Sequence, residues 1–207
     1  ARRQRDDRLF RCVLSWDGNL SGIARERKRI LHQLKSHRPL PKSITVTDFP
    51  RGLDPVGQAK RLKRGDGFIF RHYELAPKER EHMGRELARI CRGAGALFFV
   101  GGDWQLATHL RADGLHLPRW HVAKFANGAA LRGSNLLLSA SVHDEEELIA
   151  ATRAGVDFCL LSPILPTASH PGDQHLGPVK AAKLVHQAGM PIYGLGGINQ
   201  KTKKRIA

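Results

Sequence analysis

From residue 44 onward the sequence alternates between two patterns. Short apolar runs typical of buried strands are each followed by a segment in which apolar residues recur at helical spacing. Uniformly apolar strands joined through helices indicate a parallel sheet, because the helices cover it and leave little strand surface in water. Seven such units in succession favour a closed parallel barrel over an antiparallel sheet. The expected strand and helix pairs are 44–48 and 54–63, 67–72 and 77–92, 96–101 and 103–111, 113–117 and 119–132, 135–140 and 143–154, 156–161 and 177–188, and 191–195 and 199–206.

A barrel of eight strands needs one strand more than these units supply. Either the natural chain continues past Ala207 with an eighth βα unit that is missing from this sequence, or a strand-like segment at 9–16 fills the gap. The sequence favours the first reading, because an open barrel would leave two unpaired strand edges. We therefore expect two parts: a basic extension over residues 1–43, with a helix at 21–37, and a barrel over 44–207.

The chain is strongly basic. Its 207 residues carry a formal net charge of +15, and twelve Lys/Arg against four Asp/Glu give residues 1–43 a charge of +8. Such an excess can attract nucleic acid, a membrane surface or anionic small molecules. No basic strand interleaved with aromatic residues and no helix-turn-helix pattern is present, which argues against nucleic acid. The charge favours a solvated basic surface around a phosphate-binding mouth.

The apolar runs and the cysteines of the sequence indicate the cellular compartment in which the protein works. No apolar run is long enough to span a bilayer, and no signal-peptide core follows the basic start, so we expect a cytoplasmic protein with no membrane partner. Cys12, Cys91 and Cys159 lie in apolar surroundings without metal-ligand spacing. They are expected to be buried free thiols in a reducing compartment.

The segment 161–172 carries the clearest functional signal. It follows the apolar run 156–161, and its three prolines hold the chain extended, while Thr167, Ser169 and His170 offer polar side chains. The next expected strand, 191–195, runs directly into Gly196-Gly197. A hydroxyl-rich loop beside a Gly-Gly turn that opens a helix predicts a phosphate site at one end of a parallel barrel.

The order of these motifs resembles the thiamine phosphate synthase/TenI family. The resemblance covers roughly residues 44–200 and implies an α/β fold of the (β/α)8 TIM-barrel type. It rests on motifs at strand ends, taken together in the family order. They are Ile69-Phe70-Arg71-His72-Tyr73, Gly102-Asp103, Ala112-Asp113-Gly114-Leu115-His116-Leu117, Ala140-Ser141-Val142-His143, the run from Ser162 to Thr167, Leu176-Gly177 and Gly196-Gly197-Ile198.

The resemblance implies a synthase of thiamine biosynthesis. It would join an aminopyrimidine diphosphate to a thiazole phosphate and release diphosphate, with Mg²⁺ as cofactor. Asp103 and Asp113 would be the Mg²⁺ ligands at strand ends on the catalytic face, since hard carboxylate oxygens suit that ion. Arg71 would clamp phosphate with its guanidinium. Ser141 and His143 are further candidate catalytic residues, and the expected substrate-binding residues are Arg71, His72, Thr167, Ser169, His170, Gly196 and Gly197.

Each candidate also has a purely structural reading. Asp103 could cap a helix that starts at Trp104, and Asp113 could belong to the Ala-Asp-Gly turn before a strand. Arg71 could form a surface ion pair with Glu74. The hydroxyls of the 161–172 loop could be ordinary loop residues, and the Gly-Gly pair could serve a tight turn that needs positive φ.

The chain also departs from the family pattern where diphosphate would bind. The family glutamine is Ile69, its strand lysine is Tyr73, its asparagine is Gly102, and its loop lysine is His170. Two positive charges and two amides are thereby lost, while His72 adds an imidazole. Histidine replaces lysine as a cation only when it is protonated.

These departures keep two alternatives open. The chain could be a TenI-like thiazole tautomerase, which needs no metal and moves a proton with a histidine, here His143. It could also be a non-catalytic thiazole-phosphate-binding protein whose basic residues 1–43 contact a partner. In each case the expected ligands are phosphorylated thiazole or pyrimidine compounds, and a homo-oligomer remains open.

Overall fold

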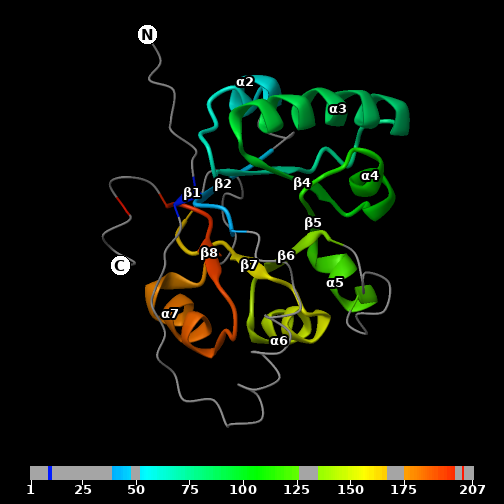
Figure 1. Cartoon of the computed structure of the whole chain (residues 1–207). Helices are drawn as coiled ribbons and strands as arrows, with labels where there is room; N and C mark the ends of the chain where they lie inside the picture. Colours follow the sequence, from blue (N-terminus) through cyan, green and yellow to red (C-terminus); the bar gives the residue numbers. More distant parts are fainter. Residues whose placement is uncertain are drawn as a thin grey trace.

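One sheet of eight strands organises the chain (Figure 1). The computed structural model describes residues 9–10, 39–47, 52–125, 135–166, 175–198 and 202. Strands follow one another across the sheet in chain order; β2 to β8 are all parallel, and β1 pairs with β2 in the antiparallel direction. The strands are β1 Leu9–Phe10, β2 Ser43–Val46, β3 Gly67–Phe70, β4 Leu97–Gly101, β5 Gly114–Leu117, β6 Leu137–Val142, β7 Phe158–Leu161 and β8 Ile192–Gly194.

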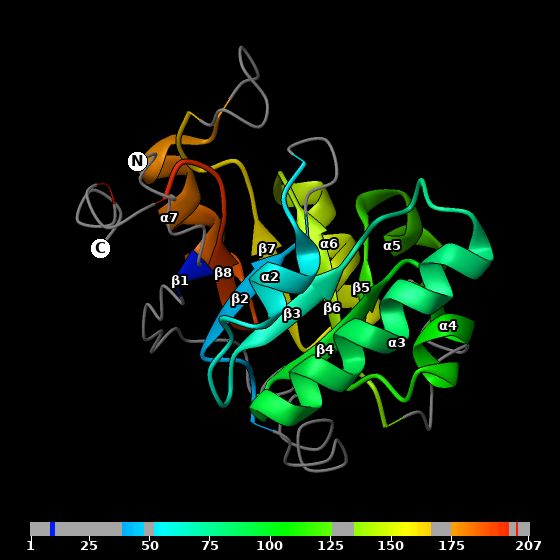
Figure 2. The ribbon, with the colours of Figure 1, turned by 90° about the horizontal axis from the view of Figure 1, so that it is seen from above.

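A helix follows each of the strands β2 to β7, and the helices lie outside the strands (Figures 1 and 2). The expected alternation is therefore confirmed within the described residues. Asp54 caps α2, accepting from the backbone N–H groups of Val56 and Gly57, and Asp144 caps α6, accepting from the backbone N–H of Glu147. The helices are α2 Pro55–Ala59, α3 Pro77–Ala94, α4 Trp104–His109, α5 Arg119–Phe125, α6 Glu145–Ala154 and α7 Gly177–Gln187. The helix expected at 21–37 lies outside the described residues, as does the one at 199–206 apart from Thr202.

The seven parallel strands form a nearly closed barrel, and β1 lies in the gap. Leu9 pairs with Ile44 and Phe10 with Ser43, while β1 also contacts β8 (Figure 2). Residues 9–10 of the strand-like segment expected at 9–16 thus lie in the gap, in the antiparallel direction, and an eighth βα unit beyond Ala207 stays a prediction. The division into an extension over 1–43 and a barrel over 44–207 remains a prediction.

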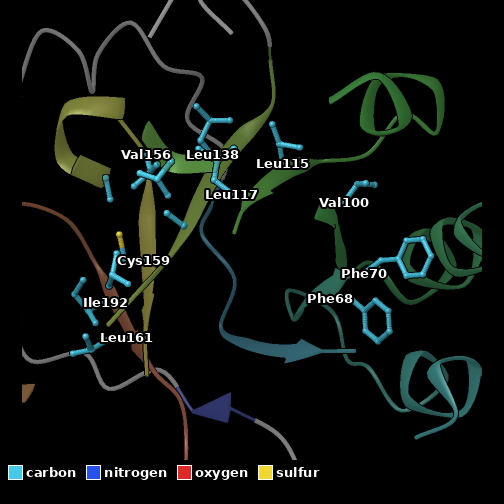
Figure 3. Packing of buried hydrophobic residues seen from close by; sticks show 14 of the residues in the cluster. Phe68, Phe70, Val100, Leu115, Leu117, Leu138, Val156, Cys159, Leu161 and Ile192 are labelled. Atoms are coloured by element: carbon cyan, nitrogen blue, oxygen red, sulfur yellow. The ribbon is translucent and has the colours of Figure 1, made fainter. Parts of the chain in front are cut away.

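Alternating residues of each strand face opposite sides of the barrel wall. The outer residues pack against the helices. Phe68 and Phe70, which Figure 3 labels, belong to one cluster with Ala59 of α2 and Leu87 of α3. The inner residues form a second apolar cluster that fills the barrel. Its buried members are Ile44, Ile69, Phe99, Leu137, Phe158, Leu160 and Tyr193.

The cysteines and the helices bear on the expectations of buried free thiols and of a chain without a membrane span. Cys91 and Cys159 are buried free cysteines, as expected, and burial raises the pKa of each thiol to about 12. Cys12 lies outside the described residues. None of the described helices combines the length and the apolar character that a bilayer crossing requires.

Candidate active site at the carboxyl ends of the strands

The inner face of the barrel becomes polar toward the carboxyl ends of the strands. Residues two apart along a strand face the same side of the wall. Arg71 comes two residues after the inward Ile69, and His116 comes two residues after Gly114. Ser139 and Ser141 continue the inward row that begins at Leu137. Their neighbours in sequence, such as Phe70 and Leu117, belong to the outer cluster. Period-two alternation therefore brings a guanidinium, an imidazole and two hydroxyls to one mouth.

Arg71 is held by the neighbouring strand. Its backbone N–H donates to Thr47 Oγ1 at 2.8 Å, and its side-chain Nε–H donates to the Thr47 carbonyl at 2.8 Å. Thr47 directly follows β2 and is 1% exposed, so this anchor is shielded from water. The arrangement fixes the start of the Arg71 side chain at the mouth, which is the position predicted for a phosphate clamp.

His116 forms the buried floor of the mouth. Its Nδ1 lies 3.0 Å from Ser139 Oγ, and its Nε2 lies 3.0 Å from Ser141 Oγ. Burial, with a smaller contribution from the positive charge of Arg71, lowers the pKa of His116 to about 3. The imidazole is therefore neutral at physiological pH, with one ring nitrogen donating and the other accepting. Sequence reasoning did not propose His116; the signal was a polar residue at an inward position of an otherwise apolar strand.

His143 lies at the end of β6 beside a carboxylate. Its Nδ1 is 2.7 Å from Glu147 Oε2, and the same oxygen accepts from the His143 backbone N–H at 2.8 Å. The other oxygen of Glu147 pairs with Arg119 at 2.8 Å. A carboxylate bound to one ring nitrogen orients the other, which is the arrangement used by histidines that move protons.

The loop after β7 is joined to the Gly-Gly turn after β8. The backbone N–H of Ile164 donates to the Leu195 carbonyl at 3.0 Å, and that of Leu165 donates to the Gly196 carbonyl at 3.1 Å. None of the described residues accepts a hydrogen bond from the N–H of Gly196 or Gly197. The two motifs that predicted a phosphate site from sequence thus lie together at the same barrel end. Thr167, Ser169 and His170 fall outside the described residues, so their roles remain predictions.

Asp103 lies at the same barrel end but is already engaged. Its Oδ1 accepts from the Leu106 backbone N–H at 2.9 Å, which makes it the N-cap of α4, and its Oδ2 lies 3.3 Å from Arg80 Nη1. The structural reading of Asp103 as a helix cap is therefore confirmed. The Asp103 side chain is 39% exposed and still reaches solvent.

The prediction that Asp113 lies on the catalytic face is wrong. Asp113 precedes β5, so it sits at the amino ends of the strands, opposite the mouth. Its Oδ2 accepts from the Phe98 backbone N–H at 2.9 Å, at the start of β4. Because β4 and β5 are parallel, Asp103 after β4 and Asp113 before β5 face opposite ends of the barrel.

The predicted Mg²⁺ site is therefore not formed by these two carboxylates. Mg²⁺ requires several oxygen ligands in octahedral geometry. Within the described ranges, no group of three His, Cys, Asp or Glu side chains is placed to hold a metal ion. The carboxylate of Asp103 faces a guanidinium instead, so the described residues do not fit the ion that the resemblance implies.

His72 does not face the mouth. It is 4% exposed, its ring stacks on Phe70 with centroids 5.6 Å apart, and its Nδ1 lies 3.0 Å from Thr47 Oγ1. These contacts lie on the outer side of the barrel wall. His72 directly follows the inward Arg71 in sequence, and its side chain is on the opposite side of the wall. The geometry gives no support to the predicted role of His72 in phosphate binding.

Comparison with known proteins places this barrel in a family. The family model described as thiamine monophosphate synthase matches residues 55–207, which is most of the chain. The chain belongs to the thiamine monophosphate synthase family. The resemblance drawn from the strand-end motifs is thereby confirmed, and with it membership in a transferase family of thiamine biosynthesis.

Individual members of the thiamine monophosphate synthase family agree with this assignment. A putative thiamine-phosphate synthase 2 of Aquifex aeolicus is 30% identical over 163 residues, which cover 77% of this chain and 86% of that protein. A thiamine-phosphate synthase of Levilactobacillus brevis is 34% identical over 155 residues, covering 72% of this chain and 71% of the relative.

Solved structures support the fold. Thiamine phosphate pyrophosphorylase from Pyrococcus furiosus superposes with a TM-score of 0.65 at 24% identity, over 79% of this chain and 78% of the other. An aldolase for 2-keto-3-deoxy-6-phosphogluconate from Zymomonas mobilis gives 0.51 at 12% identity, over 79% and 74%. The expected α/β barrel is therefore confirmed.

Proposed function

We propose that this chain is a thiamine-phosphate synthase whose active site is the mouth at the carboxyl ends of the strands. In the reaction, the bond between the pyrimidine methylene carbon and the diphosphate oxygen breaks, and diphosphate leaves with the electron pair. The lone pair of the thiazole nitrogen then forms the new carbon–nitrogen bond. These two bond changes need no general base. The active site has only to neutralise the charge of the diphosphate and to align the two rings.

The observation that carries this proposal is the anchored Arg71. A guanidinium held through its Nε–H and backbone N–H at the mouth can present its charge to a phosphoryl group at little entropic cost. Its partners in phosphate binding would be the Gly196-Gly197 turn and, from the sequence, Thr167, Ser169 and His170. Ser141 and the neutral His116 would line the floor beneath the ligand and keep water out.

Mg²⁺ would be the partner of diphosphate in the family reaction, but the described carboxylates are not placed to hold it. Asp113 lies at the other barrel end, and the carboxylate of Asp103 is paired with Arg80. Among the described residues, the cation at the mouth that would face departing diphosphate is Arg71.

A second candidate function, thiazole tautomerase activity, is favoured by the His143–Glu147 contact. A carboxylate 2.7 Å from Nδ1 directs Nε2 of His143 away from Glu147, and such a nitrogen could take a proton from a thiazole carboxylate phosphate and return it elsewhere on the ring. Arg71 and the Gly-Gly turn would bind the phosphate in this reaction too.

The two functions are separated by following products. The purified chain is given aminopyrimidine diphosphate and thiazole phosphate, and released diphosphate and thiamine phosphate are measured. In parallel, exchange of ring protons of a thiazole carboxylate phosphate with D₂O is followed by NMR. Diphosphate release that is insensitive to Glu147→Gln supports the synthase. Proton exchange that is lost in both His143→Gln and Glu147→Gln supports the tautomerase. Ligand binding without either reaction contradicts both and leaves the non-catalytic binding protein.

A further inference from the structure

Arg80 of α3 is a buried cation that the proposed chemistry does not use. It is 9% exposed, and its guanidinium carbon lies 5.6 Å from the ring centroid of Phe70 and 5.5 Å from that of Tyr73. Burial lowers the pKa of Arg80, and the carboxylate of Asp103 opposes that effect. Because an unpaired buried charge is costly, the hydrogen-bond partners of this guanidinium indicate what it does.

The donors of Arg80 join the carboxyl ends of two strands. Nη2 donates to the Gly101 carbonyl at 2.6 Å and to the Arg71 carbonyl at 3.1 Å, and Nε donates to the Arg71 carbonyl at 3.3 Å. Nη1 contacts Asp103 Oδ2 at 3.3 Å. Gly101 ends β4 and Arg71 directly follows β3, so one planar fork spans the rim of the mouth from outside.

We propose that Arg80 is a positioning residue for Arg71. Thr47 fixes the backbone N–H and the Nε–H of Arg71, and Arg80 fixes its carbonyl oxygen. Peptide groups on both sides of the Arg71 Cα are therefore held, which limits the directions in which its side chain can enter the mouth. That Arg71 binds substrate phosphate rests on the proposed function; that Arg80 orders Arg71 does not.

The role differs from simple packing in a measurable way. If Arg80 only filled space between Phe70 and Tyr73, removing it would lower the free energy of unfolding and leave the Arg71 side chain ordered in the folded protein. A positioning role predicts that, when Arg80 is removed, the Nε–H of Arg71 loses its protection from hydrogen exchange even while the protein stays folded. The reason is that the hydrogen bond of this Nε–H to Thr47 depends on Arg80 holding the Arg71 carbonyl.

The first test uses the free protein. Hydrogen exchange of the Arg71 Nε–H is measured by NMR in the wild type, Arg80→Met and Arg80→Lys. The matched control is Arg85→Met, because Arg85 lies on the same helix, pairs with Glu81 and has a side chain that is 56% exposed. We expect exchange about tenfold or more faster in Arg80→Met, the scale of a lost charge-assisted hydrogen bond, an intermediate value in Arg80→Lys and no change in Arg85→Met. If Arg80→Met does not fold, the comparison of Arg80→Lys with Arg85→Met decides. Wild-type exchange at Arg71 in a folded Arg80 variant overturns the proposal.

The second test uses thiazole phosphate as the probe and isothermal titration as the readout. We expect Arg80→Met to weaken binding, and the double variant Arg71→Met/Arg80→Met to bind within about twofold of Arg71→Met alone, because Arg80 acts through Arg71. Losses that multiply contradict the proposal. If the wild type itself fails to bind thiazole phosphate, the proposed function fails, and the exchange experiment still decides the role of Arg80.

Discussion

Thr47 and Arg71 form a two-point contact across the end of the barrel wall. The Thr47 hydroxyl accepts from the Arg71 backbone N–H, and the Thr47 carbonyl accepts from the Arg71 Nε–H, each at 2.8 Å. The same hydroxyl lies 3.0 Å from His72 Nδ1. The hydroxyl and the carbonyl of one residue thus tie the candidate phosphate clamp to the end of the neighbouring strand.

Replacing Thr47 by valine tests this anchor. Thr47→Val keeps the shape but leaves the buried Arg71 N–H without its hydroxyl acceptor, so the free energy of unfolding should fall by about 1–3 kcal/mol. Thiazole phosphate should also bind more weakly, because Arg71 is less ordered. Thr45→Val, at a buried threonine within β2, is the matched control and should leave ligand affinity unchanged. Equal affinity in Thr47→Val and the wild type would contradict the anchoring role. Urea titration and isothermal titration give the two values.

The buried His116 predicts a pH dependence of stability. Its pKa is lowered to about 3 in the folded protein, against about 6.5 for an unperturbed histidine, so the unfolded chain binds more protons between these values. The contribution of His116 is therefore complete above pH 6.5 and is lost as the pH falls through that window. Between pH 7 and pH 5 the free energy of unfolding should drop by about 2 kcal/mol more in the wild type than in His116→Gln. Urea denaturation at the two pH values checks this, and parallel pH profiles would refute it.

Asp113 should matter for stability and not for ligand binding. Asp113→Asn weakens the acceptor of the Phe98 N–H at the amino ends of β4 and β5, so we expect a loss of about 1–3 kcal/mol in the free energy of unfolding. The dissociation constant for thiazole phosphate should not change, since Asp113 lies at the far end of the barrel from the mouth. A clear loss of affinity in a folded Asp113→Asn protein would return this residue to the site.

The sequence predicted the barrel well because its signals were periodic. Apolar runs alternating with helical spacing identify strands and helices, and the structure places Arg71, a candidate from the family resemblance, directly after the apolar strand β3. Asp113 lies at the other barrel end because it precedes the apolar run 114–117, and this position decides its place where the motif match does not. Position relative to the strand, which the sequence does contain, distinguishes the two barrel ends.

Other parts of the site depend on tertiary contacts that periodicity does not encode. Arg80 lies in a charged helix and resembles a surface residue, yet the rings of Phe70 and Tyr73 and the strand-end carbonyls enclose it. The direction of β1 could not be foreseen either, because two residues pairing with Ile44 and Ser43 carry no pattern of their own. His116 carries a signal in the alternation, because a polar residue stands at an inward position of an apolar strand.

The Gly-Gly turn can be tested against a matched glycine. Gly197 and Gly155 both have φ of +69°, which L side chains rarely adopt. A Cβ on Gly197 would lie 2.5 Å from the Pro166 carbonyl oxygen, whereas one on Gly155 would meet nothing within 4 Å. Gly155→Ala should cost about 1–2 kcal/mol from backbone conformation alone. Gly197→Ala should cost more and also weaken thiazole phosphate binding. Equal costs and unchanged affinity would show that the turn does not pack against the loop after β7 as described.

The central claim is that the mouth at the carboxyl ends of the strands binds a phosphorylated heterocycle through Arg71. Isothermal titration of thiazole phosphate into the wild type and Arg71→Met tests it most directly, with the unphosphorylated thiazole alcohol as control ligand. We expect Arg71→Met to weaken binding of the phosphorylated compound by about tenfold or more and to have little effect on the alcohol. Equal binding of thiazole phosphate by both proteins would contradict it.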